Sequence, residues 1–278
     1  MIKSLKKLRH GPLKCFDPLW IAAGKFYRGT LKVLNINLST KQRIGKYGPF
    51  KMHAHFGFSD FGKWGGNHNR GFQQCIDACV GKMVVFDVGA HIGLVTLPAS
   101  EVIGEGGKVY AFEPADGNRQ FLNYHLEANK IANVEVESFL LGAKDDDEVA
   151  FYAQVGAAGT NSILHLENKG EFEQTLVRQT TIDSYCDANG IGPDLIKIDV
   201  EGAEIGVLQG AEKTLAAFKP KIFLSVHPTH IEKLGLSMDD LRQLISDFEY
   251  EVKDVDGKAV SEFCLDEYIM TPKNLENE

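Results

Sequence analysis

The sequence predicts an α/β protein built on a doubly wound, mostly parallel sheet with one antiparallel strand near its edge. From about Met83, short apolar runs rich in Val, Ile and Phe alternate with longer helical patterns, which is typical of strand–helix units on a parallel sheet. The first run turns through glycines directly into a helical pattern, as nucleotide-binding sheets do. The last two runs are joined by a connection too short for a crossover helix, so they must pair antiparallel.

The individual elements follow from local patterns along the chain. A capping box of Ser237 and Asp240 marks the start of the last helix, and Asp256 with Gly257 marks the turn between the two terminal strands. Turn residues in the stretch 145–189 predict irregular structure with two short strands. The expected strands are residues 83–88, 108–113, 134–140, 195–199, 221–226, 250–255 and 267–271, and the expected helices are residues 92–103, 116–130, 204–218 and 238–247.

The chain length of 278 residues suits one large domain with an extension. We divide it into a basic, aromatic-rich amino-terminal arm and lid, residues 1–70, and a domain of residues 71–278. Residues 1–50 contain eleven Lys and Arg against one acid, a formal charge of +10, whereas the whole chain has a net charge of -8. An acidic body of this kind does not favour nucleic acid as a partner.

The cysteines and the hydropathy bear on the cellular compartment of the protein and on whether it spans a membrane. Five scattered cysteines, with no C-x-x-C pair and no signal-peptide pattern, indicate a reducing compartment, which we expect to be the cytoplasm. The most apolar stretch, residues 84–99, is interrupted by Asp87, His91 and Pro98, so no segment is expected to span a bilayer.

The first ten residues raise the question of a membrane surface. Ile2, Leu5 and Leu8 stand at helical spacing among lysines, so residues 1–10 could lie peripherally on an anionic membrane. A solvated helix face explains the same pattern, and so does packing against a second copy in a homo-oligomer.

Two neighbouring strand ends carry residues suited to a nucleoside. The first strand runs into the turn DVGAHIG, residues 87–93, whose two glycines stand four apart behind an acid. That spacing is a poor cradle for pyrophosphate but suits a cofactor that has an ammonium group and no phosphate. The second strand ends at Glu113, where a carboxylate can accept hydrogen bonds from both hydroxyls of a ribose. The pair predicts bound adenosine without phosphate, with a plain strand-to-helix turn as the structural alternative.

Three carboxylates follow the fourth strand. Asp199, Glu201 and Glu204 emerge at the end of LIKIDVEGAE, residues 195–204. Carboxylates so close together raise one another's pKa and could act as a base, an ammonium partner or metal ligands. For Glu204 we favour a simpler role, an acid in the first turn of a helix that the macrodipole stabilises.

These motifs resemble the FkbM family of S-adenosylmethionine-dependent methyltransferases. The resemblance implies a Rossmann-like class I methyltransferase fold with a seven-stranded sheet, S-adenosylmethionine as cofactor, and O-methylation of a hydroxyl on a sugar, glycolipid or secondary metabolite. It extends from about Met83 to Leu224, about half the chain. The segments that carry it are DVGAHIG, VYAFEP (109–114), Thr181-Ile182-Asp183, LIKIDVEGAE and Leu208 with Gly210-Ala211 ahead of Pro220.

The resemblance also implies roles for individual residues. Asp199 and Glu201 would face the reacting centre. Two positions depart from the family pattern, because His91 replaces the usual Asn of the glycine turn and Ser225 replaces a Glu that many members carry before the histidine, here His227. The implied cofactor-binding residues are Asp87, Gly89 and Gly93 at the methionine part and Glu113 at the ribose, and the further cofactor-binding candidates are Ala90, His91, Pro114 and Asp199.

A general base is expected because an alcohol must lose its proton as it attacks the methyl group. His227 and Asp199 end adjacent strands at the same crevice. We assign His227 as the base, with Asp199 orienting it or the substrate and Glu201 as a further catalytic candidate. A structural histidine bonded to a loop carbonyl remains the alternative for His227.

The remaining candidate residues concern metals and the acceptor. The pairs His53/His55 and His227/His230 do not complete a zinc spacing, so we expect no metal, and a divalent ion at the strand-end carboxylates is a minor option. The aromatic, glycine-rich stretch 48–72 suits a lid that stacks on a sugar or lipid, although packing of the arm onto the sheet would explain most of its aromatics. The candidate acceptor contacts are Trp64, Asn67, Asn69 and His230.

Two other functions stay open beside the methyltransferase. One is a cofactor-binding or membrane-surface module without turnover. The other is an NAD-dependent oxidoreductase, which the absence of the G-x-G-x-x-G spacing disfavours.

Overall fold

A computed structural model describes residues 23–24, 26–31, 37–66, 69–154, 161–164 and 172–273. Residues 1–10, where membrane contact is one of the alternatives left open, and Asn67 lie outside the described residues. Within the described part, no helix is both long and apolar enough to cross a membrane.

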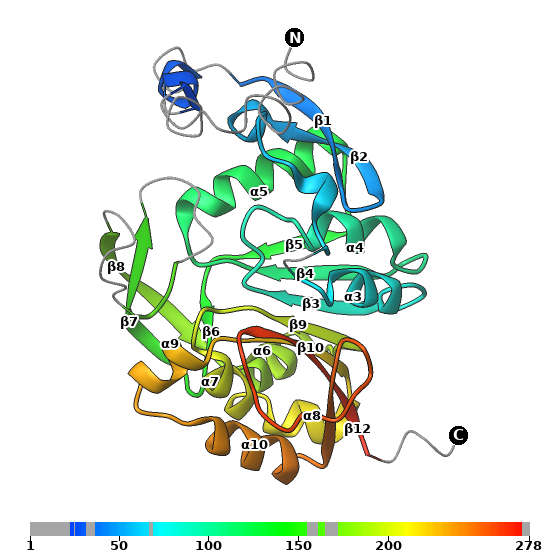
Figure 1. Ribbon diagram of the computed structural model, residues 1–278, viewed down its shortest axis with the longest axis vertical. Coiled ribbons are helices and arrows are strands. Elements are labelled where there is room, and N and C mark those ends of the chain that lie inside the picture. The colour runs from blue at the N-terminus through cyan, green and yellow to red at the C-terminus, as the bar shows by residue number, and fades with distance from the viewer. Residues whose placement is uncertain are drawn as a thin grey trace.

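The core of the protein is a seven-stranded sheet in the order β11-β12-β10-β9-β3-β4-β5. Figure 1 shows β5, β4, β3, β9 and β10 side by side. Strand β12 pairs antiparallel with both its neighbours, and the other described pairings of this sheet are parallel. The expected doubly wound sheet with one reversed strand near its edge is therefore confirmed. The strands are β3 (Val84–Val88), β4 (Lys108–Phe112), β5 (Val134–Glu137), β9 (Leu195–Ile198), β10 (Lys221–Val226), β11 (Tyr250–Asp254) and β12 (Asp266–Pro272).

Alternation along the strands divides the core into two hydrophobic clusters. On β3, Val85 belongs to one cluster and Phe86 to the other, because successive side chains of a strand point to opposite faces. One cluster packs under α6 (Ile182–Asn189), α7 (Glu204–Gln209), α8 (Glu212–Phe218) and α10 (Met238–Asp247). The other packs under α3 (Phe72–Ala78), α4 (Thr96–Val102) and α5 (Asp116–Asn129), and both Cys75 and Cys79 are buried in it.

The amino-terminal part of the described chain forms a hairpin of β1 (Ser39–Ile44) and β2 (Tyr47–His53). Figure 1 shows the hairpin beside α5, at the top of the view. Its residues Ile44, Phe50 and Met52 are buried in the same cluster as the sheet residue Val85. Short 3-10 turns, η2 (Ala54–Phe56) and η3 (Phe61–Lys63), lead from the hairpin towards α3. Most aromatics of this stretch thus pack the arm onto the sheet domain.

Three expected elements differ from the structure for local reasons. The helix expected over 204–218 is interrupted at Gly210 and Ala211, which lie between α7 and α8, and Gly210 is close enough to the Gly142 carbonyl that a side chain would come within 2.0 Å of it. The strand expected over 134–140 is split, and its last part, β6 (Leu140–Leu141), pairs with β8 (Phe172–Thr180) instead. The helix expected from residue 92 begins at Thr96, since the left-handed backbone at Gly93 (φ 91°) precedes it.

A second sheet, in the order β6-β8-β7, occupies the stretch expected to be irregular. Strands β7 (Asp146–Gln154) and β8 are nine residues each, longer than the two short strands that we expect there. The capping box of Ser237 and Asp240 is present at the start of α10. Helix α9 (Pro228–Lys233), which begins directly after His227, was not anticipated.

Candidate active site

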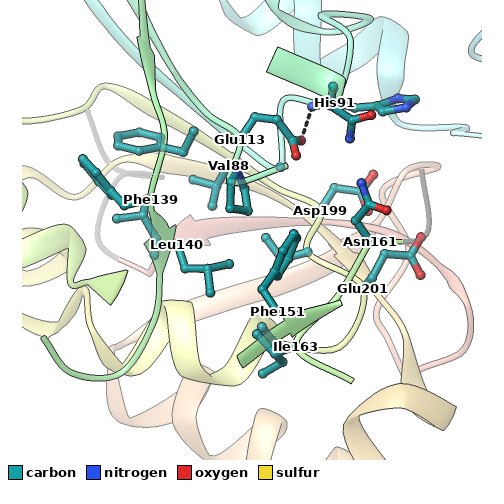
Figure 2. Close-up of a pocket in the computed structure, with 17 residues that line it drawn as sticks. Val88, His91, Glu113, Phe139, Leu140, Phe151, Asn161, Ile163, Asp199 and Glu201 are labelled. Atoms are coloured by element: carbon teal, nitrogen blue, oxygen red, sulfur yellow. Dashed lines mark hydrogen bonds between the residues drawn. The ribbon is translucent and has the colours of Figure 1, made fainter. Parts of the chain in front are cut away.

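Two pockets meet at the carboxyl ends of β3, β4, β9 and β10. The first, which we call the apolar pocket, has walls that include Phe139, Leu140, Phe151 and Ile163, with Glu113 at one end. Figure 2 shows these side chains around the space. The second, the charged pocket, contains Asp87, Lys197, His227 and Glu267. The two share Gly89, His91, Asp199 and Glu201.

The glycine turn lets β3 and β9 approach each other closely. Gly89 has a φ of 86°, and a side chain there would come within 1.9 Å of the Asp199 carbonyl oxygen. Glycine is therefore required by the backbone whether or not a ligand is bound. Gly93 packs against Leu122 and is not among the residues that line the two pockets, whereas Ala90 lines the charged pocket.

Glu113 is buried at the end of β4 and points into the apolar pocket (Figure 2). One carboxylate oxygen accepts the His91 N–H at 2.7 Å, and the other accepts the Ala115 N–H at 2.9 Å. Burial raises the pKa of Glu113 to about 7. Because a carboxylate oxygen can accept more than one hydrogen bond, Glu113 can hold the turn and still accept from ribose hydroxyls. Pro114 lines the same pocket.

His91 contributes a neutral imidazole between the two pockets. Its φ of 53° is left-handed, which a non-glycine residue adopts at some cost. Burial lowers its pKa to about 4, and its Nε2 is buried without a hydrogen-bond partner among the described residues. An unpartnered buried polar atom beside a buried carboxylate and an apolar pocket fits S-adenosylmethionine, which brings an adenine, a ribose and a charged amino-acid end.

Asp87 lies on the charged-pocket side of the glycine turn. It is buried, and its carboxylate accepts a hydrogen bond of 2.5 Å from the Thr96 hydroxyl. Burial raises the pKa of Asp87 to about 6. The residue lines the charged pocket, where a carboxylate can meet the ammonium group of the cofactor.

His227 is held by a carboxylate other than the one we expect. Its Nδ1 lies 2.6 Å from Glu204 Oε1, and its Nε2 is 3.8 Å from both Asp199 Oδ1 and Glu201 Oε1. The expectation that Asp199 orients His227 is not met by a hydrogen bond, and Glu204 is a fully buried histidine partner rather than only a first-turn acid. Burial lowers the pKa of His227, but Glu204, Asp199 and Glu201 outweigh burial, so the net shift is upward.

Glu201 and His230 lie beside His227, and Glu201 has an unusual backbone conformation. Glu201 has a φ of 52°, a left-handed conformation that is uncommon for a non-glycine residue. Its carboxylate lies 3.3 Å from His230 Nδ1, and the rings of His230 and His227 stack with centroids 5.7 Å apart. His230 therefore supports Glu201 and is not among the residues that line the charged pocket.

A buried lysine belongs to the site although the sequence analysis did not select it. Lys197 points from β9 to the same sheet face as Ser225 of β10 and Glu267 of β12, and its ammonium lies 2.6 Å from the Ser225 hydroxyl. Ser225, which stands where many members of the resembled family carry a Glu, lies directly opposite Glu267 on the neighbouring strand. The signal that could have found this site is a lysine inside an otherwise apolar strand.

Residues 64–66 and 69–71, which precede α3, cover the charged pocket, and we call them the cover. Trp64 and Asn69, two of the expected acceptor contacts, line the pocket. Arg70 pairs with Asp256 at 2.7 Å and with Asp266 at 3.3 Å, and the Gly71 N–H donates to Glu267 at 2.6 Å. Residues close to the carboxyl terminus thus hold the cover in place. His53 and His55 lie elsewhere, against Phe121 of α5.

Comparison with known proteins shows which family this chain resembles. A family model described as the methyltransferase FkbM domain matches residues 87–252, more than half of the chain. The curated Methyltransferase 1 of Beauveria bassiana (strain ARSEF 2860) is 27% identical over 148 residues, 46% of this chain and 58% of that protein. The chain thus spans less than two thirds of the length of that relative.

Solved structures with a similar arrangement include two methyltransferases. The methyltransferase FkbM from Methylobacillus flagellatus KT is 21% identical, with a TM-score of 0.44 over 69% of this chain and 43% of that one. A putative methyltransferase from Streptococcus mutans, solved in complex with SAH, is 10% identical, with a TM-score of 0.41 over 72% of this chain and 92% of that one.

Proposed function

The chain belongs to the FkbM methyltransferase family, and on that premise we propose that it transfers a methyl group to a hydroxyl of a sugar, glycolipid or secondary metabolite. Its cofactor is S-adenosylmethionine, which supplies an activated methyl group on a sulfonium. Membership of this family argues against the oxidoreductase alternative. What remains to be assigned is how the residues of this chain bind the cofactor and promote the transfer.

The two pockets bind different parts of the reactants. In this proposal the apolar pocket receives the adenine among Phe139, Leu140 and Phe151, and Glu113 accepts from the ribose. The amino-acid end of the cofactor lies along the glycine turn towards Asp87. The acceptor enters the charged pocket, so that the reacting atoms meet where the two pockets share residues. Alignment of the two reactants is then the main catalytic effect.

The observation that carries the proposal is the pairing of His227 with Glu204. When Nδ1–H donates to Glu204 at 2.6 Å, the lone pair of Nε2 is free on the pocket side. A neutral His227 can then take the proton from an acceptor hydroxyl as the oxygen attacks, with Glu204 stabilising the imidazolium that forms. Asp199 and Glu201 flank Nε2 and add to this stabilisation. Glu204 acts through His227 and is a positioning residue.

The lining of the charged pocket favours an acceptor with hydroxyl groups. Its polar floor offers hydrogen-bond acceptors, and Trp64 and Asn69 at its cover add a flat apolar surface and an amide. Such a combination suits a sugar ring, whose faces are apolar and whose rim is polar.

A transfer assay tests the proposal. The full-length protein is incubated with tritium-methyl S-adenosylmethionine and a panel of glycans, glycolipids and polyol metabolites, and labelled products are analysed for the methylated atom. We expect an O-methyl product whose formation is strongly reduced in His227→Ala. Label found only on nitrogen, or equal transfer by wild type and His227→Ala, would contradict the proposal.

A further inference from the structure

The charged pocket contains an ammonium group that the proposed reaction does not use. Lys197 is 2% exposed, yet it carries a positive charge on a sheet face that also holds the buried Asp87. Its Nζ contacts the Ser225 hydroxyl at 2.6 Å and the Ile198 carbonyl at 3.2 Å. A buried charge is tolerated only when an opposite charge and hydrogen bonds compensate it. The question is therefore which carboxylate balances Lys197.

Glu267 is better placed for this than Asp199. Its Oε1 lies 3.2 Å from Lys197 Nζ, against 3.6 Å for Asp199 Oδ2, and its side chain is 6% exposed, against 30% for Asp199. A shorter distance and deeper burial both strengthen an ion pair. Asp87 instead accepts its short hydrogen bond from Thr96.

The position of Glu267 is determined by the fold. The β10–β12 ladder sets Glu267 directly opposite Ser225, and the second oxygen of Glu267 accepts the Gly71 N–H from the cover at 2.6 Å. The residue lies beyond residues 87–252, the part of the chain that matches the family model. The carboxylate is thus supplied by the terminal strand and fixed from two sides.

We propose that Glu267 is the counter-ion of Lys197 and thereby leaves the negative charge of Asp199 available to the reacting centre. Asp199 has one oxygen towards Lys197 and the other 3.8 Å from His227 Nε2. If Asp199 alone balanced the lysine, the two charges would cancel where the pockets meet. With Glu267 present, that junction keeps the negative charge of Asp199 in addition to that of Glu201, which favours the sulfonium of the cofactor. Glu267 is therefore a positioning residue that acts through Lys197.

The inference rests on the proposed transfer site, but its test is cofactor binding and needs no acceptor. S-adenosylmethionine and S-adenosylhomocysteine differ in the methyl group and the positive charge that it brings to sulfur, so the ratio of their affinities reports the potential at the sulfur. Isothermal titration calorimetry of both ligands gives this ratio for each variant. Glu251→Gln, on the adjacent strand β11, is the matched control because it removes a partly exposed carboxylate that pairs with Lys253 and is not among the residues that line the charged pocket.

The three variants are expected to change the ratio of the two affinities in different directions. Glu267→Gln lowers the preference for S-adenosylmethionine by about three- to tenfold, the size expected for one buried charge at several ångströms. Lys197→Gln raises the preference, and the double variant returns it close to the wild-type ratio, because the net charge is restored. The double variant also provides the test if the single Glu267→Gln protein does not fold.

The outcomes separate this inference from the proposed function. An unchanged ratio in folded Glu267→Gln, or a double variant with a ratio as high as that of Lys197→Gln, would overturn the counter-ion role alone. Wild-type protein that binds neither ligand would overturn the proposed function together with it. The Glu251→Gln control should keep the wild-type ratio.

Discussion

At the scale of single residues, the site depends on how carboxylates are distributed around two histidines and one lysine. Glu204 partners His227, Glu201 partners His230, and Lys197 is shared by Glu267 and Asp199. Buried charges compensated in this way are costly to disturb singly. The pair of His227 and Glu204 therefore makes a specific prediction about protonation.

The first prediction concerns the pH dependence of methyl transfer. A base must be unprotonated, and the net upward shift of the His227 pKa keeps the imidazole protonated to higher pH. The acid limb of the turnover profile should therefore lie above the ordinary histidine value of about 6.5. Glu204→Gln removes the strongest partner and should move the limb to lower pH, while His227→Ala should lose about 10²- to 10⁴-fold in rate.

The control for this prediction is Glu232→Gln, an exposed acid on the neighbouring helix α9. It should leave the limb where the wild type has it. NMR titration of His227 in the free protein gives the same comparison without an acceptor. A limb that does not move in a folded Glu204→Gln protein would rule out the proposed pair.

The second prediction concerns Glu113 and the ribose. Glu113→Gln should weaken binding of S-adenosylhomocysteine by about 1 to 3 kcal/mol, because a paired acceptor is lost. Since burial raises the pKa of Glu113 to about 7, the carboxylate becomes protonated as the pH falls through that value, and wild-type affinity should fall with it. The Gln variant should lose this pH dependence.

Calorimetry of Glu113→Gln on either side of neutrality measures both effects. Glu127→Gln, an exposed acid on α5, is the control and should bind as the wild type does. Unchanged affinity in a folded Glu113→Gln protein would remove Glu113 from the ribose site. The carboxylate also accepts hydrogen bonds from the backbone at His91 and Ala115. The thermal unfolding temperature of the variant should therefore be measured beside the calorimetry, to show that the protein is folded.

At the scale of elements, the sequence patterns predicted the strands and helix ends whose signals are local in the sequence. Buried parallel strands are continuous apolar runs, so β3, β4, β9 and β10 were recognisable, as was the capping box of α10. Two short strands were expected where β7 and β8 lie, but their length of nine residues was not, because most of their side chains are at least partly exposed and form no apolar run. The partner of His227 depends on the orientation of α7, which sequence spacing does not determine.

The small sheet leads to the third prediction, because it closes the apolar pocket. Phe151 of β7 is 3% exposed and forms part of the pocket wall (Figure 2). Phe151→Ala should weaken binding of S-adenosylhomocysteine by about 1 to 3 kcal/mol through loss of buried apolar contact. Leu176→Ala, at an exposed position of β8, is the control and should bind normally. Normal binding by a folded Phe151→Ala protein would show that the adenine lies elsewhere.

At the scale of the whole molecule, the amino-terminal cover and the carboxyl-terminal strands meet over the sheet. Arg70 and Gly71 of the cover and Gln74 of α3 contact four residues near the terminal strands, Val255, Asp256, Asp266 and Glu267. The cover therefore belongs to the same folded unit as the site that it overlies. Surface ion pairs such as that of Arg70 contribute little stability individually, so the buried bond of Gly71 to Glu267 is the stronger contact.

The fourth prediction concerns the basic residues that precede the cover. From the formal charge of +10 over residues 1–50, we expect deletion of residues 1–10 to reduce co-sedimentation with anionic liposomes at low salt. Cofactor affinity should stay as in the full-length protein. Full-length protein that remains in the supernatant at low salt would end the membrane proposal, and packing in a homo-oligomer would then be the role to examine.

The most direct test of the account is a crystal structure of the protein with S-adenosylhomocysteine. It should show the adenine among Phe139, Leu140 and Phe151, the ribose hydroxyls on Glu113, and the sulfur directed into the charged pocket towards His227. A ribose bound away from Glu113, or a sulfur that points away from His227, would contradict the account.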